Sequence, residues 1–527
     1  MTKDNLEKAV TVYSDIPYSV LSQEIPAYKK NDFYQELGEI MEYYKIYENG
    51  ADFTVEGTNG DYQGSDVRFR KNRELINKEA RFLFAHTPDF FINKNIAHSE
   101  SEKKDATIAN DYVQAVLAKT GMGSKLVRAA KDCFIGKRVG VILNFNAESG
   151  ISITFLKSYE FIYEKDSSEN LIKFVAFYTI LDTSNKKDKR IKKKIYEMEN
   201  GVCYSTEAIY DGLGNLVEET FPRAATSFEY IPAAVIINDG LSNDGKGESE
   251  MDADQEGLYS KLANTDIDAE RKSMNAIRYT IDADSGSTAN LSSAPGAYWD
   301  IKSDKLTPDP KTAQVGMLES SMNYSAPLKT TLDRVNNYMH GQLDVPDINS
   351  EQLQGVITSG KTLKALYWGL IVRCDEKMLA WKPALEHVVR SLLDGAVLYP
   401  EAAALYSEDK IPAIVYEIDV VNNYPLLEDD TEEKTMDLSE VESMTMSKKA
   451  YMKKWRGLTD EEVDEELEQI LKEQQMFNSA MIPDERAEED EGDMEDEEFD
   501  DEEDDIDTES DRDIDAEIDS LLKEIGG

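Results

Sequence analysis

Apolar residues recur at helical spacing in the first part of the chain. One stripe combines Phe33, Leu37, Ile40, Met41, Tyr44 and Tyr47. It predicts an amphipathic helix that ends near Asn49-Gly50. Glycine and asparagine over residues 51–66 predict a turn or hairpin. Further helices are predicted over about 67–86 and within about 105–133, where Gly121-Met122-Gly123 separates two of them.

The pattern changes over residues 138–238. Short runs of β-branched and aromatic residues alternate there with loops that contain Asp, Asn and Gly. Such runs are typical of antiparallel strands. Together with the helices on either side, they predict an α+β chain.

Two helical arms with thin apolar stripes follow. The first covers about 249–281, with Ser249 as a plausible N-cap, and the second covers about 314–341. Pro327 interrupts the second arm, at the first turn of a helix capped by Ser325. An insert between the arms contains Gly, Ser, Pro and the strand-like segment AYWDI. Because a thin stripe cannot hold a helix in water, the arms point to an oligomer of unspecified number.

The strongest helical pattern lies between residues 361 and 393. Its apolar positions run from Leu363 to Leu392, Pro383 predicts a kink, and Asp394-Gly395 predicts the end. Residues 396–483 form a smaller mixed region that ends in helices. The loop 344–358 precedes the long helix.

The chain is strongly acidic, with a net charge of −47. Residues 484–513 contain 21 acidic side chains against two arginines, which gives −19 there and leaves −28 on the rest. An acidic body argues against a protein that grips nucleic acid through clustered Lys and Arg. It does not argue against a protein that DNA slides past, because a wall that repels phosphates does not hold them.

The remaining composition predicts no cofactor, metal or membrane contact. Cys133, Cys203 and Cys374 are far apart and odd in number, as expected for reduced cytosolic thiols. The start MTKDNLEKAV has no apolar signal core, and no apolar run reaches the roughly 18 residues of a membrane span. The four histidines lie outside metal-ligand spacing.

Several short segments, in order, resemble the portal proteins of tailed bacteriophages. Residues 72–84 followed by Pro88 look like a family helix and its turn, although His86 stands near the usual glycine. Residues 159–163 and 228–232 are similar to strands of the family. Val345-Pro346-Asp347, followed by Ser359-Gly360, resembles the channel loop and the start of the helix after it.

The resemblance implies a subunit made of named parts. They are a wing over 1–248, stem helices over 249–281 and 313–343, a clip over 282–312, a tunnel loop over 344–358, a long kinked wing helix over 359–395, a crown over 396–483 and an acidic tail over 484–527. It also implies a dodecameric ring without catalytic activity, at the portal vertex of the virion, whose subunits are made in the host cytoplasm. Its implied partners are the terminase, major capsid and scaffold proteins, head-completion and tail adaptor proteins, and double-stranded DNA that passes without sequence-specific binding.

The tunnel loop is the predicted functional site. Its polar residues would give the channel a mostly negative lining: Asp344, Asp347, Asn349, Glu351, Gln352 and Gln354. Repulsion of phosphates would keep the affinity for DNA low while a separate ATPase moves it.

A rival interpretation is a P-loop NTPase. Gly355, Gly360, Lys361 and Thr362 fit the fixed positions of G-x-x-x-x-G-K-[ST]. A P-loop needs a buried strand before it, and INSEQLQ is polar. Asp239 and Asp419 are the possible magnesium partners, and neither is compelling.

A second rival is an acidic scaffold or adaptor that binds partners through its tail. Residues 513–527 could form a helix with one apolar face, and we hypothesise that it docks on an assembly partner. The basic run 186–194 could bind nucleic acid, but a solvated hairpin tip between two strands is the preferred interpretation.

Overall fold

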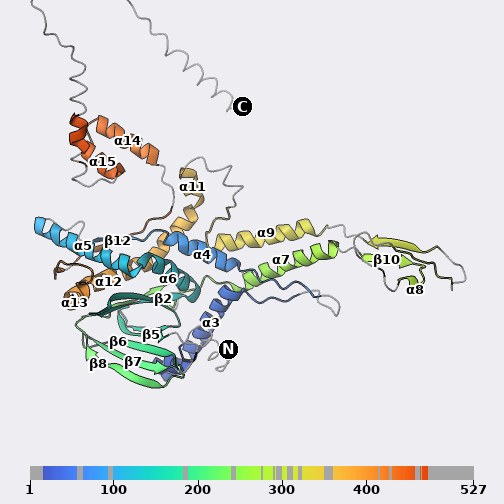
Figure 1. Cartoon of the computed structure of the whole chain (residues 1–527), viewed down its shortest axis with the longest axis horizontal. Helices are drawn as coiled ribbons and strands as arrows, with labels where there is room; N and C mark the ends of the chain where they lie inside the picture. Colours follow the sequence, from blue (N-terminus) through green and yellow to red (C-terminus); the bar gives the residue numbers. More distant parts are fainter. Residues whose placement is uncertain are drawn as a thin grey trace, which may run out of the picture. The chain divides into compact units, whose positions relative to one another are not determined.

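The computed structural model describes most of the chain. The described residues are 16–55, 63–92, 99–181, 185, 188–238, 245–274, 277–288, 291, 299–305, 312–318, 323–348, 360–413, 416–425, 430–456, 463 and 466–472. They belong to two units, Met1–Asp429 and Asp430–Gly527, each described here by itself. Helices and antiparallel sheets both occur in the first unit, which confirms the α+β class (Figure 1).

Helices precede the sheets, as the apolar spacing predicted. They are α2 (Tyr18–Leu21), α3 (Lys30–Asn49), α4 (Lys71–Leu83), α5 (Glu100–Thr120) and α6 (Met122–Gly136), with the 3₁₀ turns η1 (Ser22–Glu24) and η2 (Ala27–Lys29). Gly121 links α5 to α6 at a φ of 66°, a left-handed conformation that glycine adopts at little cost. Ser99 and Glu102 form a capping box at the start of α5.

Two antiparallel sheets occupy the predicted β region. Their orders are β3-β2-β9 and β4-β5-β6-β7-β8. The strands are β2 (Arg138–Asn146), β3 (Gly150–Lys157), β4 (Phe161–Lys165), β5 (Leu171–Leu181), β6 (Arg190–Glu199), β7 (Val202–Asp211), β8 (Leu216–Ala225) and β9 (Ala233–Ile237). Asp166 and Asp211 shape two of the turns identically, because each accepts the backbone N–H of the asparagine four residues later at 2.8 Å.

The basic run 186–194 lies only partly at the predicted hairpin tip: Asp188 and Lys189 stand in the turn between β5 and β6, and residues 186–187 lie outside the described residues. Lys192, Lys193 and Lys194 lie within β6 and not in the turn before it. Glu207 pairs with Lys192 and Lys194, and Glu24 pairs with Lys193 at 2.7 Å. Glutamates from neighbouring segments therefore neutralise these lysines, which leaves no reason to assign them to nucleic acid.

The long predicted helix is in fact two helices. α11 (Gly360–Leu366) and α12 (Trp368–Leu398) are separated by Tyr367, whose ψ of 4° is not helical. α12 packs on β9 and β2 and buries a stripe of large side chains. Pro383 lies inside α12, and the kink expected there stays a prediction.

The predicted end of α12 was wrong. The helix continues through Asp394 and Gly395 to Leu398. A Cβ added at Gly395 would lie 2.3 Å from ring carbons of Phe145 on β2. Glycine is therefore needed there for close packing of helix on sheet, not for a left-handed cap.

The two arms are shorter than predicted. α7 (Ala253–Met274) starts after Asp252, which accepts the backbone N–H of Gln255 at 3.0 Å, so Asp252 and not Ser249 caps it. α9 (Ser325–Gln342) has Pro327 in its first turn, as predicted, but Ser325 is its first residue and not its cap. Figure 1 shows α7 and α9 side by side.

The missing ends of the arms form a small sheet. β10 (Ile277–Ile281) and β11 (Gln314–Leu318) pair antiparallel, and the short helix α8 (Ser285–Thr288) follows β10. β-branched and aromatic residues in β10 favour the strand over the predicted helix. In the predicted strand AYWDI, residues 297–298 lie outside the described residues, and 299–301 are not a strand.

An extended strap, residues 65–70, lies along α7. The sequence predicted a turn and then a helix from residue 67. Its backbone N–H groups pair with side chains at every fourth position of α7: Ser65 with Asp268 Oδ2 (2.9 Å), Val67 with Asn264 Oδ1 (2.9 Å) and Phe69 with Ser260 Oγ (3.2 Å). Two extended residues advance about 6.6 Å and four helical residues about 6 Å, so the two spacings match.

The region after α12 is divided between the two units. In the first unit, α13 (Pro400–Ala403) follows α12, and β12 (Ile418–Val421) pairs with β1 (Asp89–Ile92). The second unit contains α14 (Asp430–Glu442) and α15 (Lys448–Arg456), which Asp437 joins by accepting from Trp455 Nε1 at 2.8 Å. The acidic tail and its possible terminal helix over 513–527 lie outside the described residues.

Candidate functional site

The second arm, α9, is stabilised by very little burial. Of its 18 residues, the buried ones are Met339 and His340, both near its end. Ser273 Oγ of α7 lies 3.2 Å from Tyr324 Oη, just before α9. Helices in proteins depend on packing of an apolar face, and the described residues supply α9 with little such packing.

The β10–β11 sheet has large apolar side chains exposed on both faces. Tyr279 (40% exposed) and Ile281 (47%) lie on one face. Val315 (51%) lies directly opposite Thr280, so it and Met317 (53%) belong to the other face. A two-stranded sheet is marginal in water, and both faces of this one expose apolar side chains.

The segment after α9 is tied back to that helix. We define residues 343–348 as the loop base. Buried His340 holds it, since its Nδ1 lies 2.8 Å from the carbonyl oxygen of Val345. Burial lowers the pKa of His340, so the neutral ring donates this hydrogen bond. Asn336 Nδ2 donates to Asp347 Oδ2 at 2.6 Å, which fixes a second point of the loop base.

α12 supports the other side of the loop base. Exposed Asp344 has a φ of 50°, and a Cβ added at Gly369 would lie 3.4 Å from the Asp344 Cβ. One turn further along, Arg373 Nη1 donates to the carbonyl oxygen of Gln342 at 3.4 Å. The start of the predicted tunnel loop is thus held between α9 and α12.

Arg373 also belongs to a buried cluster of charges, which we call the joint. Its members are Glu79 from α4, Glu250 from the segment before α7, and Arg373 and Lys377 from α12. Arg373 Nε donates to Glu79 Oε1 at 2.8 Å, and its Nη2 donates to Glu250 Oε1 at 3.2 Å. Lys377 lies 3.5 Å from Glu79 Oε1 and donates to Glu250 Oε1. The joint therefore connects α4, α12 and the segment before α7 to the last residue of α9, which directly precedes the loop base.

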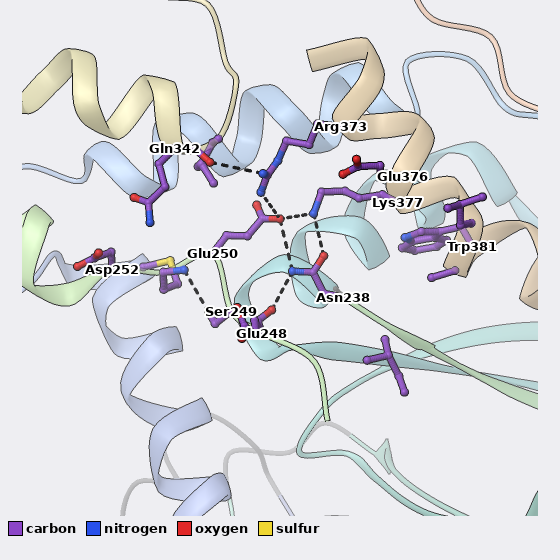
Figure 2. Close-up of a pocket in the computed structure, with 15 residues that line it drawn as sticks. Asn238, Glu248, Ser249, Glu250, Asp252, Gln342, Arg373, Glu376, Lys377 and Trp381 are labelled. Carbon is purple, nitrogen blue, oxygen red and sulfur yellow. Dashed lines mark hydrogen bonds and ion pairs between the residues drawn. The ribbon is translucent and has the colours of Figure 1, made fainter. Parts of the chain in front are cut away.

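Asn238, at the end of β9, completes the joint on the sheet side. Its Oδ1 accepts from Lys377 at 2.8 Å, and its Nδ2 donates to the carbonyl oxygen of Glu248 at 2.8 Å. Figure 2 shows these side chains converging beside a cavity of about 780 Å³. Trp381 lines the same cavity from α12.

The structure places only part of the predicted channel lining. Asp344 and Asp347 lie on the loop base and are exposed. Asn349, Glu351, Gln352 and Gln354 lie outside the described residues, so the lining as a whole stays a prediction. Asp347 has a structural contact that the sequence did not indicate, with Asn336.

The P-loop pattern is described only at its end. Gly360, Lys361 and Thr362 begin α11, but their side chains and Gly355 lie outside the described residues. One possible magnesium partner, Asp239, lies outside them as well. The other, Asp419, accepts from Lys382 Nζ at 2.6 Å in an ion pair.

Sequence reasoning missed the joint. Its four charged residues come from segments up to 298 positions apart, from Glu79 to Lys377. One signal was available. Arg373 and Lys377 are four residues apart, and each directly precedes a residue of the apolar stripe, Cys374 or Met378. Two cations beside a buried stripe require buried anions.

The described residues contain neither a metal-binding cluster nor a membrane-spanning helix. No group of three or more His, Cys, Asp or Glu among them could hold a metal ion. Within the same residues, none of the helices combines the length and apolar character that crossing a bilayer requires.

Comparison with known proteins gave one finding. A family model described as phage portal protein, SPP1 Gp6-like, matches residues 26–480. No curated protein matches the chain. The family match covers the described sheets, both arms, the joint and the loop base.

Proposed function

This chain belongs to the phage portal protein family, SPP1 Gp6-like, and we propose that its copies form a ring at one capsid vertex. Double-stranded DNA passes through the ring during packaging and ejection. Family membership across residues 26–480 is the observation that carries this proposal. The chain acts by mechanics and electrostatics, and a separate motor supplies the hydrolysis of ATP.

Ring formation accounts for the surfaces that one chain leaves uncovered. α9 buries two of its residues, and β10–β11 exposes apolar side chains on both faces. Neighbouring copies would bury these groups on both sides, which an interface on one side alone could not do. Burial of apolar area stabilises such contacts by about 25 cal/mol per Å².

The acidic character of the chain suits passage and opposes retention of DNA. The net charge outside residues 484–513 is −28, and the loop base presents Asp344 and Asp347. With Glu351, these carboxylates from all copies would repel phosphates near the axis. DNA would then move under force without a sequence-specific contact.

The partners follow from the same arrangement. We place the small β10–β11 sheet and the insert 282–312 at the end that faces the terminase during packaging and the head-completion or tail adaptor proteins afterwards. The wing would contact the major capsid and scaffold proteins. The number of subunits is proposed to be twelve.

A charge placed on the small sheet tests ring formation. We expect Val315→Glu to lower the particle mass in solution to that of small species. The substitution would place a charge on the sheet face that neighbouring copies bury, and burial of unpaired charges is costly. Val217→Glu is the matched control. Val217 is equally exposed (49%), but it lies on the edge strand β8 of the wing.

Light scattering coupled to size exclusion measures the mass of both variants. A multi-subunit particle that survives Val315→Glu would contradict assembly through this sheet. A wild-type chain that is monomeric at all concentrations would contradict the ring itself.

A further inference from the structure

Two buried carboxyl groups share the same two cations inside the joint. Glu79 is fully buried and the side chain of Glu250 is 5% exposed. Both carboxyl groups pair with the same two cations, Arg373 and Lys377, and each carboxyl shifts the pKa of the other. Two ionised carboxylates repel each other and have no proton to place between them, so their shared position needs an explanation.

The two oxygen atoms of each carboxyl group differ in their partners, and this difference gives the explanation. The ion pairs with Arg373 and Lys377 go to Oε1 of Glu79 and Oε1 of Glu250. Asn238 Nδ2 also approaches Oε1 of Glu250, at 3.4 Å. Both Oε2 atoms are buried and receive no hydrogen bond from any donor among the described residues. One proton between the two carboxyls would satisfy both atoms.

We propose that Glu79 and Glu250 share one proton near neutral pH, so that the joint contains a carboxylic acid bonded to a carboxylate. The proton is a structural ligand that comes from water. It joins α4 to the segment before α7, and Arg373 extends the connection to the last residue of α9. The site is independent of whether the chain forms a ring.

The surrounding charges are consistent with this assignment. The charged groups that face Glu79 are Glu250, Arg373 and Lys377. Burial and then the charge of Glu250 raise the pKa of Glu79 to about 8. Burial alone would raise the pKa of Glu250, but Lys377 and Arg373 lower it to about 2. Cys133 and Cys374 are near, and burial raises the pKa of both thiols, so they stay neutral.

Infrared spectroscopy tests the proposal directly. A protonated carboxyl has a C=O stretch separate from that of carboxylates, and at pH 6.5 the full-length chain should show it. We expect Glu79→Gln to remove the signal of one protonated carboxyl per chain. Glu160 and Glu256, whose pKa burial raises to about 7, contribute equally to both spectra and cancel in the difference. Glu74→Gln, on the same helix but in surface ion pairs, should remove none.

Glu250→Gln distinguishes a proton shared by the two carboxyls from a proton held on Glu79 by burial alone. With the partner carboxylate gone, Glu79 faces Arg373 and Lys377 alone and should ionise, so this variant also loses one signal. A Glu250→Gln spectrum that keeps the signal would mean that burial alone protonates Glu79. Unchanged spectra of both variants would mean that the pair carries no proton. Either result overturns the proposal.

Discussion

At some positions of this chain, neighbours that are distant in sequence determine which residue fits. Gly395 occupies the middle of a helix because the ring of Phe145 leaves no room for a Cβ. Gly341 is also helical, but no atom of the described residues outside its own helix lies within 4 Å of the position of its Cβ. The two glycines are indistinguishable locally, so the sequence could not separate a packing glycine from a helix end.

Alanine at these two positions should have opposite effects. We expect Gly395→Ala to lower the free energy of unfolding by about 1–3 kcal/mol, because Phe145 must move. Gly341→Ala should raise it by up to about 1 kcal/mol, since alanine loses less backbone freedom in a helix. Urea unfolding of both variants measures the difference. Equal effects of the two would contradict the close packing of α12 on β2.

The joint predicts a pH dependence of stability. Because the pKa of Glu79 is raised to about 8 from an ordinary value of 4.5, the folded chain keeps a proton that the unfolded chain releases between these pH values. The free energy of unfolding should therefore fall as the pH rises from 4.5 to 8, by up to about 1.4 kcal/mol per unit from this group.

Glu79→Gln should reduce that slope, while Glu160 and Glu256, whose pKa burial also raises, keep the remainder. Glutamine keeps the shape of the protonated acid and does not titrate. Urea unfolding at several pH values between 5 and 8 gives the slope for each variant. Glu74→Gln is the control, since the pKa of Glu74 is lowered and its contribution is lost only below pH 4.5. An unchanged slope in Glu79→Gln would contradict a protonated Glu79.

At the scale of elements, the spacing of apolar residues predicted the helices and strands that depend on their own sequence. The spacing of apolar residues indicated α3, α5 and α6, and the β-branched runs indicated the antiparallel strands. The strap was missed because its hydrogen bonds go to side chains of α7 almost 200 residues away. The ends of the two arms were missed because a thin apolar stripe does not distinguish a helix from a short exposed strand pair.

Asn264 is the central contact of the strap. It accepts from Val67 N and donates to the carbonyl oxygen of Val67 at 2.6 Å. Asn264→Ala would leave both backbone groups without partners and should cost about 1–3 kcal/mol. Thr265→Ala is the neighbouring control, because Thr265 bonds only its own helix, and it should change stability by less than about 0.5 kcal/mol. Equal losses in thermal unfolding would argue against the strap.

At the scale of the molecule, the sequence predicted the order of the helices and sheets but not the contacts that connect them. Two arms around an insert, followed by a loop and a long helix, were predicted from pattern and from the resemblance, and the family match covers them. The joint could not be predicted because it depends on which segments meet. The tunnel loop between residues 349 and 359 stays a prediction.

The central claim is that copies of this chain surround a channel. Negative-stain electron microscopy of the purified full-length chain tests it most directly. We expect class averages of a ring with one central hole and rotational symmetry. Compact particles of one or two chains without a hole, at every concentration imaged, would contradict it.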